Sequence, residues 1–157
     1  MNIFLGGPIT NILDSSGLVK KQFRNEVEGI IRYLCEHKYT IFSAHETERY
    51  GEETSKFTNM DILRRDFSWM EKCDLYIAYY ASMKKEILRS DGTNIEIGWA
   101  YALNKPIIVI CDFLLVSQLS LILQGMLQTK AANLFCGELG EDLIAMIQQS
   151  VRKGEIR

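Results

Sequence analysis

The sequence predicts an α/β fold: a doubly wound parallel sheet of about five strands flanked by helices, of the flavodoxin or Rossmann-like kind. Two observations lead to this prediction. Short apolar runs with the length of strands alternate along the chain with longer segments in which apolar residues recur at helical spacing. The chain has 157 residues, which suits one domain with a full core, and it contains no internal repeat, low-complexity tract or linker. We therefore treat residues 1–157 as a single domain.

Five apolar runs are predicted to be strands. Glycines and a proline break the first run, and long polar loops at residues 44–58 and 81–92 follow the second and third runs. The last run is the weakest of the five. The predicted strands are residues 2–5, 39–43, 75–80, 106–111 and 133–136.

Helical spacing of apolar residues predicts the elements between the strands. In the second helix this spacing places Ile62, Leu63, Phe67, Met70 and Cys73 on the inward face. The predicted helices are residues 17–37 and 59–72, a short helix that begins near residue 94, and residues 114–126 and 141–152.

The short helix carries the acidic residue of greatest interest, Glu96. Thr93 is the predicted N-cap, which puts Glu96 in the first turn, where backbone N–H groups and the helix dipole favour an ionised carboxylate. A carboxylate held charged at the mouth of an α/β sheet is a candidate nucleophile. The competing interpretation is a capping box, in which Glu96 only satisfies the backbone N–H of Thr93.

Polar or glycine-rich turns follow four of the predicted strands. The carboxyl ends of parallel strands lie at one edge of the sheet, where such folds bind ligands, so we expect these turns to meet there. Gly6 and Gly7 would let a ligand approach the backbone closely, although a tight turn explains them equally well. The four turns are Gly6-Gly7-Pro8, Ala44-His45-Glu46, Ser90 to Glu96, and residues 112–120.

Asp66 and His45 are further candidates for this site. Asp66 lies in the apolar stripe of the helix at 59–72, where loss of water raises a carboxyl pKa and suits the group to general acid catalysis, unless it makes a structural hydrogen bond. For His45 the alternative is a solvated loop. No second histidine lies at ligand spacing from His45, so we expect no metal site. Neither a GxGxxG motif nor a P-loop occurs, so we expect no cofactor.

Composition limits the kinds of binding partner and the cellular compartment that we expect for this protein. The formal net charge is −2, and without a basic excess we expect neither nucleic acid nor an anionic membrane as the main partner, whereas a small anionic ligand needs only a local site. The apolar runs are too short to span a bilayer, and residues 1–5 lack the features of a signal peptide. The four cysteines are widely spaced, which indicates buried free thiols in a reducing cytoplasm.

Several segments, in the same order along the chain, resemble the nucleoside 2-deoxyribosyltransferase superfamily, which contains transferases and nucleotide N-hydrolases. The resemblance covers nearly the whole chain and is nearest to the nucleoside 5′-monophosphate N-hydrolase branch. Its most specific segment is Ser90-x-Gly92-Thr93-x-x-Glu96-Ile97-Gly98-Trp99-Ala100. The other segments are Ile3 to Pro8, Ser43 to Glu46 with Tyr50-Gly51, Arg65-Asp66, and Cys73-Asp74-Leu75.

The resemblance implies an N-glycosidase that acts on a nucleoside 5′-monophosphate, with Glu96 attacking the anomeric carbon and Asp66 near the leaving base or the sugar. The resemblance implies that Ser90 hydrogen-bonds the phosphate. Transferases for free nucleosides have an Asp at the matching position, and an Asp would repel phosphate. A segment like Leu119-Ser120 reaches the neighbouring subunit's phosphate in such hydrolases, which implies a homodimer with shared sites. The implied substrate-binding residues are Phe4, Gly6, Gly7, Pro8, His45, Ser90, Asp91, Gly92, Thr93 and Ser120.

The first strand and its loop depart from part of that superfamily. Some deoxynucleotide hydrolases have a tyrosine on this strand and a serine in the loop, where this chain has Ile3 beside Phe4, and Gly7. Hydrolases acting on cytidine monophosphate have a Gly-Pro turn more like Gly7-Pro8. The choice between ribose and 2′-deoxyribose, and the base, therefore stay open. Two alternative functions are a nucleoside 2-deoxyribosyltransferase that exchanges bases, and a non-catalytic nucleotide-binding or signalling module.

Overall fold

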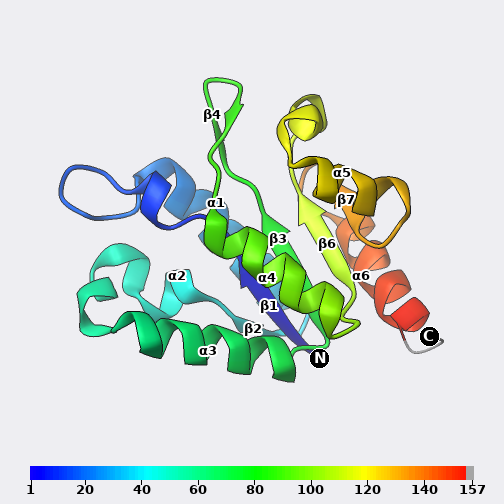
Figure 1. Cartoon of the computed structure of the whole chain (residues 1–157), viewed down its shortest axis with the longest axis horizontal. Coiled ribbons are helices and arrows are strands. Elements are labelled where there is room, and N and C mark those ends of the chain that lie inside the picture. The colour runs from blue at the N-terminus through cyan, green and yellow to red at the C-terminus, as the bar shows by residue number, and fades with distance from the viewer. Residues whose placement is uncertain (155–157) are drawn as a thin grey trace.

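Five parallel strands form the central sheet of the computed structural model, which describes residues 1–154 of the chain (Figure 1). The spatial order is β2-β1-β3-β6-β7, which is that of a doubly wound α/β fold and confirms the predicted fold class. The strands are β1 (Asn2–Gly6), β2 (Thr40–Phe42), β3 (Leu75–Tyr79), β6 (Ile107–Ile110) and β7 (Asn133–Phe135).

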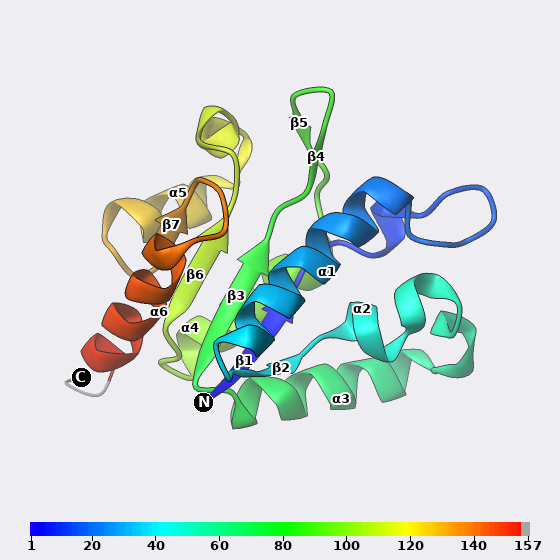
Figure 2. The same ribbon diagram turned by 180° about the vertical axis from the view of Figure 1, so that it is seen from behind.

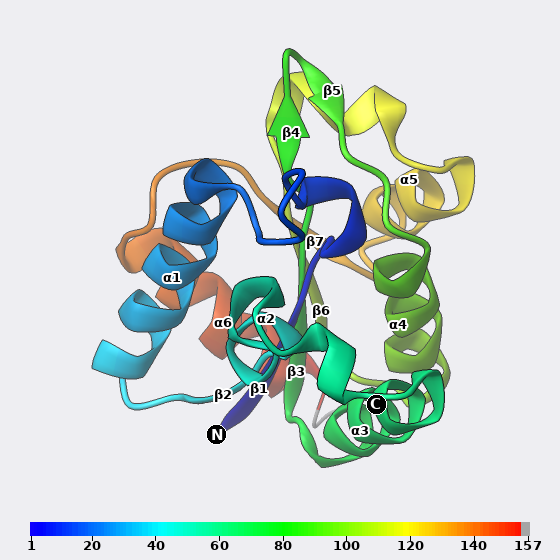
Figure 3. The same ribbon diagram turned by 90° about the vertical axis from the view of Figure 1, so that its left-hand side faces the viewer.

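Helices cover both faces of the sheet (Figures 2 and 3). On one face lie α1 (Lys21–Glu36) and α6 (Glu141–Gly154), and on the other lie α3 (Asn59–Lys72), α4 (Asp91–Ala102) and α5 (Leu121–Gln128). Because side chains alternate along a strand, Ile3 and Leu5 of β1 pack in the first core cluster, whereas Phe4 packs in the second with Tyr76 of β3. The sheet is therefore buried on both faces, as its apolar strands predict.

The order of the strands reverses between β1 and β3, which are neighbours in the sheet. Their register pairs Ile3 with Leu75 and Gly6 with Ala78. From β1 the chain crosses to β2 at one edge, and from β3 it crosses to β6 on the other side. A crevice at the carboxyl ends of β1 and β3 is therefore the place where this topology accommodates ligands.

The two long polar loops contain regular structure that the sequence did not predict. The segment at 44–58 folds into α2 (Ala44–Thr47) and two 3-10 turns, η2 (Arg49–Gly51) and η3 (Thr54–Lys56). The segment at 81–92 contains a hairpin of β4 (Ser82–Met83) and β5 (Glu86–Ile87). Its two turn residues, Lys84 and Lys85, have positive φ, which glycine or asparagine usually supplies, so the sequence has no hairpin signature here.

Besides α4, two of the predicted helices have different boundaries. The first begins at Lys21 instead of residue 17, because the preceding residues form a turn closed by a bridge between Leu13 and Val19; a short 3-10 turn, η1 (Thr10–Ile12), precedes it. The segment predicted as one helix at 114–126 is η4 (Phe113–Gln118) followed by α5, because Ser120 takes an extended conformation and caps a new helix by accepting from the Leu123 amide.

The burial predictions are correct only in part. On α3, Met70 and Asp66 are buried, but Leu63 and Phe67 are 49% and 38% exposed. Phe67 instead contacts Trp99 of α4 edge-on, with ring centroids 5.2 Å apart, at the border of the core. Of the four cysteines, all free, Cys73 and Cys111 are buried whereas Cys35 and Cys136 are exposed. Within residues 1–154, no helix is both long and apolar enough to cross a membrane.

Candidate active site

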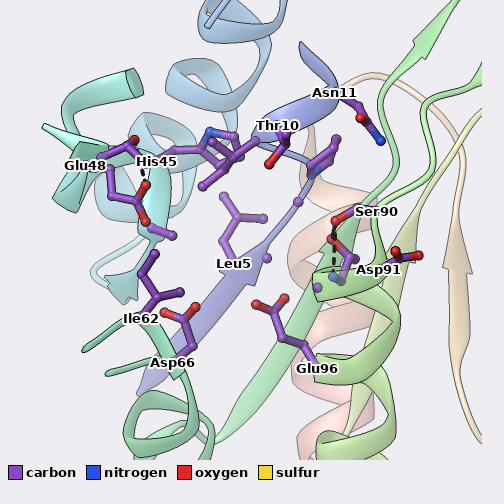
Figure 4. A pocket seen from close by; sticks show the side chains of 18 of the residues that line it. Leu5, Thr10, Asn11, His45, Glu48, Ile62, Asp66, Ser90, Asp91 and Glu96 are labelled. Atoms are coloured by element: carbon purple, nitrogen blue, oxygen red, sulfur yellow. Dashed lines mark hydrogen bonds between the residues drawn. The ribbon is translucent and has the colours of Figure 1, made fainter. Parts of the chain in front are cut away.

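A cavity of about 410 Å³ lies at the carboxyl ends of β1 and β2, beside the N-terminus of α4 (Figure 4). Its walls come from the end of β1 and the following loop, from α2 and α3, and from the start of α4. The structure therefore brings together nearly all of the residues that the sequence analysis selected. Those that line the cavity are Phe4, Gly6, Gly7, Pro8, His45, Asp66, Ser90, Asp91, Gly92, Thr93 and Glu96.

Ser120 is the selected residue that does not reach this cavity. It lines a smaller neighbouring cavity of about 70 Å³, which it shares with Arg89 and Asn94. The main cavity of the same protomer is therefore built without the Leu119-Ser120 segment.

The start of α4 differs from the sequence prediction. Ser90, not Thr93, is the N-cap: its Oγ accepts from the Thr93 amide at 3.2 Å and from the Thr93 hydroxyl at 2.9 Å. The helix begins at Asp91, so Glu96 is in its second turn, out of reach of a capping box. Glu96 is therefore free of the helix cap, and its carboxyl group lines the cavity instead.

A buried tyrosine holds that carboxyl group. The hydroxyl of Tyr76, the second residue of β3, donates to Glu96 Oε2 at 2.6 Å. Tyr76 is fully buried, so in the sequence it was indistinguishable from an ordinary core residue of an apolar strand. β1 carries no tyrosine; its neighbour β3 supplies the hydroxyl that donates to Glu96.

Gly6 is required where β1 passes these two side chains. A Cβ atom at Gly6 would overlap both the Tyr76 hydroxyl and Glu96 Oε2. Gly7 is less restricted, because a Cβ atom there would lie 3.3 Å from Tyr79 and 3.4 Å from His45 Nε2. The absence of a side chain at Gly6 thus makes room for the Tyr76–Glu96 hydrogen bond and leaves the floor of the cavity as bare backbone.

Burial is the main cause that raises the pKa of Glu96 to about 8; the Tyr76 hydrogen bond opposes the rise, and the negative charge of Asp66 contributes to it. The expectation that Glu96 lies in the first helical turn is therefore wrong, and burial favours the protonated form of its carboxyl group. The physical reasons are that the Glu96 carboxyl group is buried, lies one turn too deep for the free N–H groups of the helix, and faces Asp66 across the cavity.

Asp66 lies opposite Glu96, on α3. Figure 4 shows the two carboxyl groups pointing toward each other across the cavity. Burial raises the pKa of Asp66, and a hydrogen bond from Arg65 Nε to Asp66 Oδ1 at 2.8 Å opposes that rise. Two carboxyl groups with raised pKa values, facing each other in one cavity, can share a proton and exchange acid and base roles.

His45 is buried rather than part of a solvated loop. It is 1% exposed, and neither ring nitrogen has a hydrogen-bond partner within the described chain. Burial lowers its pKa to about 4, so the ring is neutral near pH 7, with one nitrogen a donor and the other an acceptor. Unpaired polar atoms beside a cavity indicate a contact that a ligand completes.

Sequence reasoning missed several residues of the cavity. Arg65 was visible only as part of a resemblance, and Glu48 lies in a segment that looked like solvated loop. Asn11 donates its amide to the Arg89 carbonyl and so ties the loop after β1 to the residue before the cap of α4. The lining residues that were not among the candidate site residues are Leu5, Ile9, Thr10, Asn11, Ala44, Glu48, Thr54, Ile62, Arg65 and Arg89. The described residues contain no cluster of three or more His, Cys, Asp or Glu side chains suited to a metal ion.

Comparisons with known proteins agree with this architecture. No curated protein matches the chain significantly. Among solved structures, the Clostridium botulinum CMP N-glycosidase BcmB is 19% identical with a TM-score of 0.62, covering 95% of this chain and 99% of that one. The solution structure of BlsM is 21% identical with a TM-score of 0.70, covering 98% and 88%. A conserved protein from Enterococcus faecalis V583 is 16% identical with a TM-score of 0.55, covering 97% of each chain.

These identities show a shared fold, whereas the family follows from the sequence match. The family model of nucleoside 2-deoxyribosyltransferase matches residues 16–124, which is most of the chain and includes Asp66, Ser90 and Glu96. The chain therefore belongs to the nucleoside 2-deoxyribosyltransferase family.

Proposed function

We propose that this protein is a nucleoside 5′-monophosphate N-glycosidase, which hydrolyses the base–sugar bond to free base and (deoxy)ribose 5-phosphate. One observation carries the proposal: Glu96 and Asp66 face each other across a cavity that also contains the N-terminus of a helix. A sugar lies between the two acids, and its phosphate lies at the helix N-terminus. The structural similarity to a CMP N-glycosidase supports this reaction class.

In the first step, the single proton that the two acids share is on Asp66, and the ionised Glu96 attacks C1′ while the C1′–N bond breaks. The electron pair of that bond goes to the base nitrogen, and protonated Asp66 supplies the proton that the leaving base needs. Tyr76 holds Oε2 of Glu96, so the other oxygen is the nucleophile. The transition state has oxocarbenium character, which a neighbouring carboxylate stabilises.

In the second step, water attacks C1′ of the glycosyl ester on Glu96. Asp66, now ionised, takes the proton from this water, and the ester oxygen leaves as the Glu96 carboxylate. The sugar phosphate departs with a hydroxyl at C1′, and both acids return to their starting protonation states. The reaction therefore starts from the state in which Asp66 is protonated and Glu96 is ionised.

The start of α4 suits a phosphate. The two hydrogen bonds from Thr93 occupy the lone pairs of Ser90 Oγ, which leaves the Ser90 hydroxyl proton free to donate. The amides of Asp91 and Gly92 lie in the first turn of α4, where N–H groups have no partner inside the helix. Figure 4 shows the Asp91 carboxylate pointing away from Glu96.

A panel of substrates tests the proposed reaction. We expect the protein to release free base from at least one nucleoside 5′-monophosphate, detected by chromatography, with an equal amount of sugar phosphate. Addition of a second free base separates hydrolysis from the family's transferase reaction, because a transferase forms the new nucleoside. Absence of free base from all monophosphates and nucleosides, with or without an acceptor base, would leave only a binding module.

Ser90→Asp tests the phosphate assignment. Asp is also a good N-cap, so the helix is expected to form, but its charge repels phosphate. We expect the KM for monophosphates to rise by about tenfold or more, and that for nucleosides to change by less than about threefold. The measurement is steady-state kinetics on both substrate classes, with Ser82→Asp in the hairpin as control. Equal effects on monophosphates and nucleosides would mean that Ser90 does not face phosphate.

We also propose a homodimer in which Ser120 completes the partner's site. Ser120 does not reach the cavity of its own protomer, and it lies beside an apolar face that is 70–84% exposed. Such a patch marks an interface rather than ordinary surface. This face consists of Phe113, Leu114, Leu121 and Ile122.

Leu121→Asp tests the dimer. An acid at the first residue of α5 favours the helix itself, so the protomer is expected to stay folded while the apolar face is broken. We expect the wild type to elute as a dimer in size-exclusion chromatography with light scattering, and the variant as a monomer with little activity. Met60→Asp, at a 51% exposed methionine of α3, is the matched control. A wild type that is already monomeric and active would overturn the shared site.

A further inference from the structure

A series of hydrogen-bonded charged and polar side chains lies behind Asp66. The Thr54 hydroxyl donates to Glu48 Oε2 at 2.8 Å, and Arg65 Nη2 donates to Glu48 Oε1 at 2.8 Å. Arg65 Nε then donates to Asp66 Oδ1 at 2.8 Å. The side chains of Glu48, Arg65 and Asp66 are 3%, 12% and 11% exposed, so solvent does not screen these contacts strongly. This series of hydrogen bonds connects the segment after α2 to Asp66.

Two aromatic rings fix the guanidinium of Arg65. Its central carbon lies 4.8 Å from the centroid of Trp69 and 5.3 Å from that of Phe57. A guanidinium is planar and presents its donors in fixed directions, so one side chain can bond two acids at once. A lysine ammonium would keep the charge but not this fixed geometry.

The arrangement leaves one oxygen of Asp66 available. Oδ1 is bonded to Arg65, and no group within residues 1–154 donates to Oδ2. Asp66 lines the cavity, and Figure 4 shows its carboxyl group directed into it. Glu48 precedes Arg49 and Tyr50, which both have positive φ, so the backbone accepts strain next to the residue that holds Arg65.

We propose that Arg65 is a positioning residue for Asp66, and that Glu48 sets the direction of Arg65. The inference rests on the proposed glycosidase function. Arg65 lines the cavity and its Nη1 has no partner within the described residues, but its role in the reaction runs through the bond from Nε to the Asp66 carboxyl group. It orients the Asp66 carboxyl group so that Oδ2 meets the leaving base, and it limits how far burial raises the proton affinity of that group. A purely structural ion pair would instead affect stability alone.

Two substitutions separate geometry from charge. Arg65→Lys keeps the charge and Arg65→Ala removes the side chain, and we expect kcat to fall by about 100-fold in both, with KM changed by less than about threefold. Guanidinium ion at millimolar concentration should restore part of the activity of Arg65→Ala, because it fits the space between Phe57 and Trp69. The control is Arg24→Ala: Arg24 also pairs with a glutamate, Glu28, and lies 4.6 Å from the ring centroid of Tyr50, but it does not line the cavity.

A titration of the free protein tests the proposal without any substrate. Carbon-13 NMR of the Asp66 carboxyl group should show a higher pKa in Arg65→Ala than in the wild type and in Arg24→Ala. An unchanged Asp66 pKa in a folded Arg65→Ala protein would overturn the positioning role, and so would full activity of Arg65→Lys. Failure of the proposed function is seen separately, as the absence of base release by the wild type.

Discussion

Glu96→Gln is expected to abolish base release while making the protein more stable. Glutamine retains the acceptor for the Tyr76 hydroxyl but cannot attack C1′, so turnover should fall by roughly a thousandfold or more. The gain in stability follows from burial, which raises the pKa of Glu96 to about 8. Removing a carboxylate that the folded state disfavours lowers the energy of that state relative to the unfolded chain.

The pH dependence of this stability gain has a definite sign. The ordinary pKa of a glutamate in an unfolded chain is 4.5, and in the folded protein burial raises the pKa of Glu96 to about 8. Between these values the unfolded chain loses its Glu96 proton first, so wild-type stability declines as pH rises and levels off above pH 8. Because the side chain is only half-buried, we expect a gain of about 1–3 kcal/mol for Glu96→Gln at pH 8, and little at pH 4.

Thermal unfolding at the two pH values, together with chromatographic detection of base, measures both effects. Glu46→Gln is the matched control, because Glu46 is exposed on α2 and outside the cavity. We expect it to retain activity and to show no such pH-dependent gain. A Glu96→Gln protein that still releases base at the wild-type rate would remove Glu96 from the mechanism, and equal stability at both pH values would contradict its raised pKa.

The second large effect is a bell-shaped dependence of kcat/KM on pH. The proposed reaction needs the Glu96–Asp66 pair with a single proton, so activity should fall about tenfold per pH unit once the second proton leaves. Burial raises the pKa of Glu96 to about 8, which places the alkaline limb near that pH. The acidic limb follows the first ionisation of the pair, and burial also raises the pKa of Asp66.

Two variants test the assignment of the limbs. Tyr76→Phe removes the hydrogen bond that opposes the rise in the pKa of Glu96, so the alkaline limb should move to higher pH. Asp66→Asn removes the partner acid, and its residual activity should rise with pH to a plateau instead of falling again. Tyr80→Phe is the control, because its hydroxyl donates to Asn94 rather than to either acid. A wild-type profile that rises to a plateau above pH 8 would remove Asp66 as the proton donor.

The sequence was sufficient for the fold and for the edge of the sheet that carries the cavity. Apolar strands alternating with helical spacing leave few arrangements other than a parallel sheet, and its carboxyl edge collects the turns that follow the strands. Gly6, Asp66 and Glu96 could be found in this way because each stands out from its local pattern: two glycines after a strand, an acid in an apolar stripe, and an acid at the start of a helix.

The predictions that were wrong or missing concern contacts between segments that are distant in the sequence. Both Ser90 and Thr93 can cap a helix, and only the extended backbone at Ser90 decides between them. Tyr76 looks like any core residue until β3 lies beside β1 and its hydroxyl meets Glu96. Glu48 is an acid in a polar loop, and only packing against α3 places it against Arg65. The pKa of Glu96 reflects burial and Asp66 together, which local spacing does not encode.

Trapping the covalent intermediate is the most direct measurement of the role of Glu96. A 2′-fluoro nucleoside 5′-monophosphate slows both steps, because fluorine destabilises the oxocarbenium-like transition states. After mixing and acid quenching, mass spectrometry should find the sugar phosphate attached to the peptide that contains Glu96, in an amount equal to a burst of free base. Release of base without any adduct, or with an adduct on another residue, would contradict Glu96 as the nucleophile.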